Sequence, residues 1–420
     1  MKKRKLLVLG AVATLALALL TACGSSSDSS ASSSTTPDTT YAGQGIAVEG
    51  DTIYVGIFQP TTGENGGGGY QEVLGTRYAH ELYPTVTIDG TEYNIELVEV
   101  DNQSDKAAAV TAAQNLISSK VVAVTGSYGS GVSIAAGQTF ADACVPAVAC
   151  SATNPQVTLG NDFYYRVCFL DPFQGTVAAN YCMTEGYETA AVIQQNGDDY
   201  STGLASYFKD AYAALGGEVV SDQTFQTNES DFKAILTSIK ETNPDVIYCP
   251  SSIVTACLII QQARALGIEA VIMAGDTWEN ETIITTTGAD SEGVVLTTFF
   301  DENDTENPVA GEFVKGFKDY INSSKDNLTH NGGSDGVAAV SALAYDSYMA
   351  VYYALESLDG QGLETITSGD IRDALVGVSF DGVTGAISFD ENGDANKTVA
   401  YIKTVEDGAF KFLRTQDAQE

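Results

Sequence analysis

Residues 121–155, VVAVTGSYGSGVSIAAGQTFADACVPAVACSATNP, contain the pattern from which the fold is predicted. Two short apolar runs, Val121–Thr125 and Pro146–Cys150, lie on either side of an expected helix at Val132–Ala143. Each run is followed by a loop of small and hydroxyl-bearing residues. Apolar runs of this length that alternate with helices are typical of a parallel sheet covered on both faces. The stretch therefore predicts βαβ units.

The same alternation continues on both sides of this stretch. Upstream, strands are expected at 51–58 and 93–100, and helices at 70–82 and 105–118. The pattern restarts near residue 171, with strands expected at 190–195, 218–224, 246–249, 270–273 and 293–297, and helices at 201–215, 231–242 and 255–266. Helices are then expected at 310–321, 338–358 and 371–376, followed by antiparallel strands at 385–389, 398–403 and 410–413 with turns at Gly393 and Gly408.

This order predicts an α/β protein with two Rossmann-like lobes, each built on a parallel sheet and joined by a multi-strand hinge. The roughly 375 residues after the N-terminal segments are too many for one ordinary hydrophobic core. The acidic stretch at 301–308 is interpreted as a return to the first lobe. We therefore assign 46–170 and 300–382 to lobe 1, and 171–299 and 383–420 to lobe 2.

The N-terminus has the features of a lipoprotein signal. Basic residues at 2–5 precede an apolar run at 6–20, and Leu20-Thr21-Ala22-Cys23 forms a lipobox. The run of about 15 residues is shorter than the roughly 20 that a membrane-spanning helix needs, although such an anchor is the alternative. We expect 1–22 to be a signal peptide, Cys23 to be lipidated at the outer face of the cell membrane, and 23–45 to form a disordered tether rich in Ser and Thr.

Charge limits the classes of partner. Removing 1–22 takes away four of the 20 basic residues and none of the 55 acidic ones, which leaves a formal charge of −39. Such a charge argues against nucleic acid, whose phosphates require a basic surface. It also argues against adhesion to anionic lipid, so membrane attachment would depend on the lipid on Cys23.

Neither the cysteines nor the histidines indicate a cofactor or metal. The six cysteines after Cys23 include no pair with CxxC spacing. We interpret them as buried free thiols, with disulfides as the alternative in an extracytoplasmic protein. The two histidines, His80 and His330, lie in unrelated contexts, which makes a histidine-based zinc site an unsuitable interpretation.

Candidate ligand-binding loops follow the expected strands, because open α/β sheets bind ligands beyond the carboxyl ends of their strands. These loops are 61–69, with four successive glycines, and 126–131, 151–155, 198–203 and 275–278, the last of which holds the only tryptophan. The glycine run has two open interpretations, a close approach to a ligand and a flexible crossing. Gly129-Ser130-Gly131 is half of a dinucleotide fingerprint, but Ile134 replaces the third glycine, so NAD is not expected.

Hydroxyl groups and free backbone N–H groups at the start of a helix form an anion site, for which a plain helix cap by Ser130 is the alternative. On the second lobe, Asp276 and aromatic side chains occupy equivalent strand ends. An α-amino acid requires this combination, with its carboxylate on the hydroxyl side and its ammonium group on Asp276.

From about Asp51 to its end, the chain resembles the branched-chain amino-acid type (Leu/Ile/Val-binding-like) of ABC-transporter solute-binding protein, which implies a type I periplasmic binding fold. The resemblance rests on motifs that occur in the same order over roughly 370 residues. They are Thr62-Gly63, residues 100–105 (VDNQSD), Gly129-Ser130, residues 151–155 (SATNP), residues 199–203 (DYSTG), residues 262–267 (QARALG), residues 382–385 (GVTG) and residues 389–394 (FDENGD).

The resemblance also implies roles for single residues. Ser130 and Thr153 resemble the hydroxyls that hold the ligand carboxylate, with help from the backbone of Ser151 and Ala152. Tyr200 and Asp276 resemble the residues that hold the ammonium group.

The expected side-chain pocket departs from the branched-chain pattern. Family members often have aromatic residues where this chain has Gly68 and Ser252. We expect Tyr128 and Trp278 to compensate for them.

The expected function is that of a monomeric, extracytoplasmic solute-binding lipoprotein of an ABC importer. It would capture an amino acid, branched-chain or otherwise apolar, between two closing lobes and deliver it to the permease subunits, without any cofactor. An enzyme is not expected, because the chain lacks GxSxG, HExxH and P-loop motifs. The alternatives are a binding protein of the same family for an amide, a sugar, an aromatic acid or another small non-zwitterionic solute, and a sensory or adhesive lipoprotein.

Overall fold

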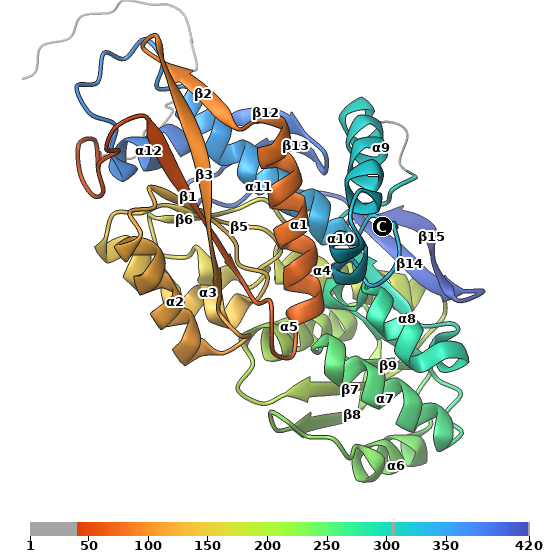
Figure 1. Ribbon diagram of the computed structural model, residues 1–420. Coiled ribbons are helices and arrows are strands. Elements are labelled where there is room, and N and C mark those ends of the chain that lie inside the picture. Colours follow the sequence, from red (N-terminus) through yellow and green to blue (C-terminus); the bar gives the residue numbers. More distant parts are fainter. Residues whose placement is uncertain (1–39, 304–306, 419–420) are drawn as a thin grey trace, which may run out of the picture. The chain divides into compact units, whose positions relative to one another are not determined.

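The computed structural model describes residues 40–303 and 307–418. Their strands form a six-stranded sheet, a seven-stranded sheet and a two-stranded sheet. Helices lie against the two large sheets (Figure 1). The predicted α/β class with two mostly parallel sheets is therefore confirmed.

The first sheet has the strand order β2-β3-β1-β4-β5-β6, and only β2 runs antiparallel to its neighbour. Strands β4 and β5 are short and fully buried, as their apolar sequences predict. The strands are β1 (Thr52–Gln59), β2 (Thr85–Ile88), β3 (Thr91–Asp101), β4 (Ala123–Thr125), β5 (Ala147–Ala149) and β6 (Tyr164–Arg166). The helices between them are α1 (Gly66–Leu82), α2 (Lys106–Ser118), α3 (Ser130–Asp142) and the single turn η1 (Pro155–Val157).

The second sheet has the order β15-β14-β11-β10-β9-β7-β8, with β14 and β15 antiparallel at one edge. Its strands are β7 (Thr189–Gln195), β8 (Glu218–Phe225), β9 (Val246–Tyr248), β10 (Val271–Ala274), β11 (Val295–Thr298), β14 (Ala400–Glu406) and β15 (Ala409–Gln416). Its helices are α4 (Asp171–Thr184), α5 (Asp199–Ala214), α6 (Lys233–Thr242), α7 (Ile253–Ala265) and α8 (Glu281–Thr287), with the short turns η2 (Asp276–Trp278) and η3 (Gly288–Ser291).

The segment after β11 returns to the first sheet. There α11 (Ala339–Glu356) packs along α1 and contacts β4 and β5. The remaining elements of this segment are α9 (Pro308–Asn322), α10 (Lys325–His330), α12 (Ser368–Leu375) and the hairpin β12 (Ser379–Gly382) and β13 (Gly385–Ser388). The chain then goes back to the second sheet through β14, so it passes between the sheets three times, after β6, after β11 and after β13.

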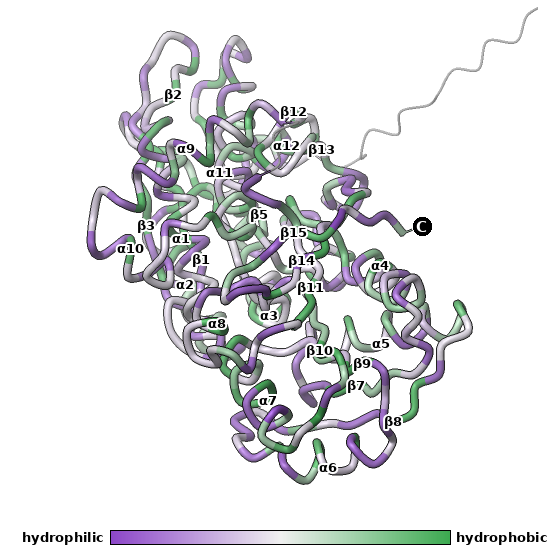
Figure 2. The backbone as a smooth tube through the Cα atoms, turned by 90° about the vertical axis from the view of Figure 1, so that its right-hand side faces the viewer, coloured by the Kyte–Doolittle hydropathy of each residue, from purple (hydrophilic) through white to green (hydrophobic). Residues whose placement is uncertain are grey.

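Figure 2 shows apolar residues along interior strands such as β11 and polar residues in outer loops such as the one beside α10. Five of the six cysteines in the described residues are buried, Cys144 is half-buried, and all six are free thiols. Among the described residues, no helix has the length and apolar character to span a bilayer. The predicted signal peptide, lipidation site and most of the predicted tether lie outside the described residues.

The glycine run forms the first turn of α1, which begins at Gly66 rather than at residue 70, so neither a flexible crossing nor a loop describes it. Close packing requires glycine at Gly68 and Gly69. A Cβ atom on Gly69 would lie 2.0 Å from Pro60 O, and one on Gly68 would lie 2.5 Å from the Tyr128 ring.

Other expectations were incomplete or wrong. Strands β2, β6 and β12 and helices α4, α8 and α10 were not predicted. The strand expected at 385–389 pairs with β12, not with the strand at 398–403, so the Gly393 turn does not join neighbouring strands. The Gly408 turn does join β14 to β15, as predicted.

Candidate functional site

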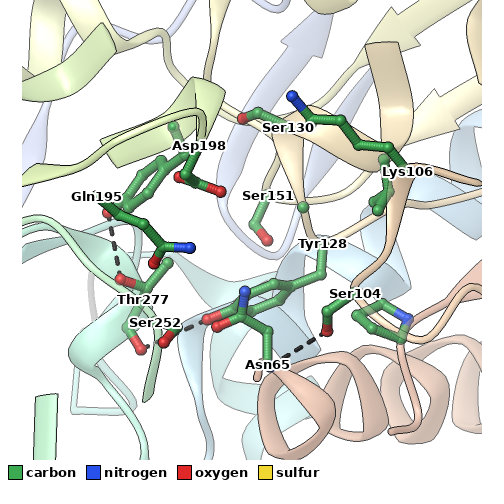
Figure 3. Close-up of a pocket in the computed structure, with 15 residues that line it drawn as sticks. Asn65, Ser104, Lys106, Tyr128, Ser130, Ser151, Gln195, Asp198, Ser252 and Thr277 are labelled. Atoms are coloured by element: carbon green, nitrogen blue, oxygen red, sulfur yellow. Dashed lines mark hydrogen bonds between the residues drawn. The ribbon is translucent and has the colours of Figure 1, made fainter. Parts of the chain in front are cut away.

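A cavity of about 60 Å³ lies between loops of the two large sheets (Figure 3). The loops after β1, β3, β4 and β5 form one side, and those after β7, β9 and β10 form the other. All of these loops follow carboxyl ends of parallel strands, where α/β sheets bind ligands. The lining residues are Pro60, Asn65, Ser104, Lys106, Tyr128, Gly129, Ser130, Gly131, Val132, Ser151, Gln195, Asp198, Tyr200, Ser252 and Thr277.

The first-sheet side presents two buried hydroxyl groups. Ser130 is the first residue of α3, and its Oγ accepts a hydrogen bond from Asn154 N at 3.2 Å. The N-cap residue is Gly129 and makes no side-chain cap, so the alternative of a plain cap by Ser130 is wrong. Ser151 Oγ donates to Glu72 Oε1 at 2.5 Å. Hydroxyls beside an uncapped helix N-terminus can bind a carboxylate.

The loop that continues from Ser151 lies directly behind this wall. Ala152 and Thr153 are fully buried and do not line the cavity. Ala152 O accepts a hydrogen bond from Arg166 Nη1 at 2.9 Å. Thr153 Oγ1 makes no hydrogen bond of normal geometry within the described residues, and it lies near the carboxyl group of Asp171, whose pKa it lowers.

On the second-sheet side, Tyr200 lines the cavity and connects it to a buried acid. Tyr200 Oη donates to Asp276 Oδ1 at 3.1 Å, and Gln174 Nε2 donates to the same oxygen at 2.8 Å. Asp276 is 2% exposed, and burial raises its pKa to about 7. A cation in the cavity would compensate this buried carboxyl group, because an unpaired charge in a protein interior is unfavourable.

Two further buried acids, Glu72 on α1 and Asp171 at the start of α4, lie near Asp276. Burial raises the pKa of each to about 8, and the charge of Asp276 contributes to both shifts. Within the described residues, Glu72 Oε2 and both carboxyl oxygens of Asp171 lack hydrogen-bond partners. At neutral pH the raised pKa values keep Glu72 and Asp171 largely protonated, so Asp276 is the acid of this group best placed to pair with a positive group on the ligand.

Of the residues predicted to contact the side chain of the ligand, some line the cavity and one lies in the core. Tyr128 lines the cavity, with its ring against Gly68 and its Oη donating to Thr277 O at 3.4 Å. Ser252 also lines the cavity and caps α7 by accepting from Thr255 N. Trp278 is fully buried and does not line the cavity, and its Nε1 donates to Ser251 O at 3.1 Å.

Polar contacts close the cavity at its rim. Lys106 Nζ lies 2.8 Å from Asp199 Oδ2 and donates to Gly197 O at 3.1 Å. Asn154 Nδ2 donates to Asp199 O at 2.8 Å. Each contact joins a first-sheet loop to the loop after β7, so the two sides meet around the cavity.

Asn65, Asp198 and Thr277 lie in loops that were predicted as candidates for ligand binding, but no role was predicted for these residues. Sequence reasoning missed Ser104, Lys106 and Gln195 in the lining, and Glu72, Asp171 and Gln174 behind it. Most of the lining residues directly follow strands, so the strand-end rule had the signal to find them. Glu72 carries no such signal, because it lies on the second turn of a helix. Among the described residues, no group of three or more His, Cys, Asp or Glu side chains is placed to hold a metal ion.

Residues 52–409 match the model of the family described as "Periplasmic binding protein". The leucine-binding protein LivK of Thermotoga maritima is similar in structure, with 33% identity, a TM-score of 0.78, and coverage of 87% of this chain and 99% of that one. The LivJ substrate-binding protein of Streptococcus pneumoniae, solved with isoleucine, has 30% identity, a TM-score of 0.76 and coverage of 87% and 99%. The Leu/Ile/Val-binding protein homolog 1 of Brucella melitensis is 29% identical over 374 residues, which are 86% of this chain and 93% of that protein.

Proposed function

Because this chain belongs to the periplasmic binding protein family, we propose that it captures an amino acid outside the cytoplasm and delivers it to the permease of an ABC importer. The solute-binding character and the extracytoplasmic location follow from the family. The names of the LivK and LivJ proteins support an amino acid as the class of ligand.

One observation carries the proposal: buried hydroxyls on one wall of the cavity face Tyr200 on the other, and Tyr200 is hydrogen-bonded to the buried Asp276 behind it. Ser130, the N–H groups that begin α3 and the backbone of Ser151 would hold the ligand carboxylate. Tyr200 Oη and Asp276 would hold the ammonium group. Thr153, whose hydroxyl makes no hydrogen bond of normal geometry within the described residues, is proposed to join the carboxylate contacts.

We assign the two sides of the cavity to the lobes expected from the sequence, 46–170 with 300–382 and 171–299 with 383–420. The three passages of the chain between the sheets would act as the hinge. Ligand binding would favour closure, since closure brings Asp276 and Tyr200 onto a ligand already held by the first lobe. Hinge closure of two domains around a ligand is the general motion of periplasmic binding proteins.

We further propose that Cys23 carries a lipid that anchors a monomer to the outer face of the cell membrane. The lipobox at 20–23 and the acidic composition of the chain support lipid attachment.

Isothermal titration calorimetry tests the proposed ligand class. Co-purified ligand is first removed by unfolding and refolding, and the protein is then titrated with the common amino acids and with their α-hydroxy-acid and amide analogues. We expect an amino acid to bind at least about 30-fold more tightly than its hydroxy-acid analogue, because losing the ammonium group leaves Asp276 unpaired at a cost of roughly 2 kcal/mol or more. Binding of acids or amides without any amino acid would instead favour a non-zwitterionic solute.

A further inference from the structure

We infer that the ligand is an α-amino acid with a short, uncharged, hydrogen-bonding side chain, such as serine, threonine or asparagine, rather than a branched apolar one. The inference rests on the proposed function. That function places the carboxylate and ammonium groups of the ligand, and the inference concerns the part of the cavity that would then contact the ligand side chain.

Most of the residues that line the cavity have a polar group on the side chain. Of its 15 lining residues, only Pro60 and Val132 have wholly aliphatic side chains. The parts not assigned to the zwitterion come from Asn65, Ser104, Gln195, Ser252 and Thr277, whose side chains gather around the lower part of the cavity in Figure 3. The hydroxyls of Ser104, Ser252 and Thr277 have partners within the protein, so the amide of Gln195 is the group that an aliphatic side chain would leave poorly paired.

The protein itself fills the apolar space of the site. The Tyr128 ring packs so closely on Gly68 that a Cβ atom there would lie 2.5 Å from the ring. Its Oη reaches across to Thr277 O at 3.4 Å, so the ring lies between the first-sheet and second-sheet loops. The cavity of about 60 Å³ has to hold the whole ligand, which favours a small amino acid.

Gln195 has an amide group available for the ligand. It is only 4% exposed, and its Nε2 makes long contacts, 3.3 Å to Thr227 Oγ1 and 3.5 Å to Glu64 Oε2. A ligand oxygen at normal hydrogen-bond distance would improve on both contacts. The site therefore offers more to a polar side chain than to an apolar one.

The charged groups of the lining already have partners, which favours an uncharged side chain. Lys106 Nζ is paired with Asp199 at 2.8 Å. Asp198 Oδ1 accepts from Ser201 N at 2.7 Å as the cap of α5. A charged ligand side chain would compete with these interactions.

The test is titration calorimetry of the ligand-stripped protein with serine, threonine, asparagine, leucine, isoleucine and valine. Mass spectrometry of the small molecules released on denaturation is the second readout. We expect one of the polar amino acids to bind at least about tenfold more tightly than any of the three branched ones, since each unpaired buried polar group costs about that much. Tightest binding by leucine, isoleucine or valine would overturn this inference and leave the proposed function standing. Binding of no amino acid at all would overturn both.

Two variants at neighbouring positions test whether Gln195 provides the preference for a polar side chain. Gln195→Leu should weaken binding of the polar amino acid at least about tenfold and leave leucine binding unchanged or stronger. Gln194→Leu is the matched control, because Gln194 points to the other face of β7 and donates to Asp222 at 3.1 Å. Thermal melts of both variants confirm folding. Equal losses in both variants, or no loss in either, would contradict the role of Gln195, and Ser252→Ala then provides an independent test of the same wall.

Discussion

Arg166 and Asp394 form a buried ion pair that joins the ligand-binding loop to the last passage of the chain between the sheets. Arg166 Nε lies 2.5 Å from Asp394 Oδ1, and the Arg166 side chain is fully buried. Its Nη1 atom donates to Ala152 O at 2.9 Å and to Asn154 O at 2.8 Å. One guanidinium group therefore holds the backbone of the loop that carries Ser151 and the segment that leads into β14.

Replacing Arg166 with methionine should weaken both the fold and ligand binding. Breaking a buried pair leaves Asp394 uncompensated, so we expect the free energy of unfolding to fall by about 3–5 kcal/mol. Urea titration measures this change, and calorimetry should show weaker ligand binding because the loop carbonyls lose their donor. The control is Lys209→Met, whose exposed pair with Asp222 should contribute less than about 1 kcal/mol. Equal effects of the two changes would contradict the role given to Arg166.

The Asp276→Asn variant tests whether the Asp276 carboxylate binds the ammonium group of the ligand. The amide can still accept from Tyr200 and Gln174 but carries no charge, so we expect amino-acid binding to weaken by about 30- to several-thousand-fold. Calorimetry gives the change, and the exposed Asp210 on α5 supplies the control variant Asp210→Asn. Unchanged affinity in Asp276→Asn would remove this residue from the site.

The ligand-free protein should lose stability as the pH rises from about 5 to 8. Burial raises the pKa of Asp276 to about 7 and those of Glu72 and Asp171 to about 8, whereas the unfolded chain has ordinary values near 4. The folded state then binds more protons than the unfolded state over this interval, so the free energy of unfolding decreases with pH.

Thermal melts across this range check the sign. Glu72→Gln should make the decline shallower, because the amide keeps the acceptor for Ser151 but does not titrate. Glu81→Gln, an exposed change on the same helix, should leave the slope as it is. A melting temperature that rises from pH 5 to pH 8, or an unaltered slope in Glu72→Gln, would show the assignment to be wrong.

Replacing two neighbouring glycines of α1 with alanine should change the stability of the protein in opposite directions. Gly67→Ala places a Cβ atom 3.5 Å from Asn280, an ordinary contact, so the gain in helix propensity should stabilise the protein by roughly 0.5–1 kcal/mol. Gly68→Ala drives a Cβ atom into the Tyr128 ring and should destabilise by about 1–3 kcal/mol and weaken ligand binding. Denaturant titration measures both changes, and partial recovery in Gly68→Ala with Tyr128→Leu would identify the ring as the obstacle. Stabilisation by Gly68→Ala would contradict the close packing.

Cys23→Ala should release the protein from membranes. With no lipid attached, the acidic chain has no affinity for anionic bilayers, and we expect it in the soluble extracytoplasmic fraction. Cell fractionation and immunoblotting give the distribution, with Cys144→Ala as the cysteine control. Retention of Cys23→Ala in the membrane fraction would favour an uncleaved membrane-spanning anchor.

The local pattern of apolar and polar residues was sufficient to predict the features that depend on residues close together in the sequence. Apolar runs identified the interior strands, and the small polar residues after them placed Ser130, Ser151 and Tyr200 at one end of the sheets, where the structure brings them into one cavity. The reason is physical: in a parallel sheet, every strand-to-helix loop leaves the same edge, so strand order need not be known.

Features that depend on packing between distant segments could not be predicted from this local pattern. Gly68 and Gly69 lie in the first turn of α1 despite the poor helix propensity of glycine, because Tyr128 and Pro60 leave no room for a side chain at these two positions. Glu72 faces Ser151 because of how α1 lies on the first sheet, and Trp278 points into the core because Ser251 O receives its N–H group. The position of a residue relative to the strands in the sequence determines at which edge of a sheet it lies. Its contacts there depend on the close packing of helices and side chains from distant parts of the chain.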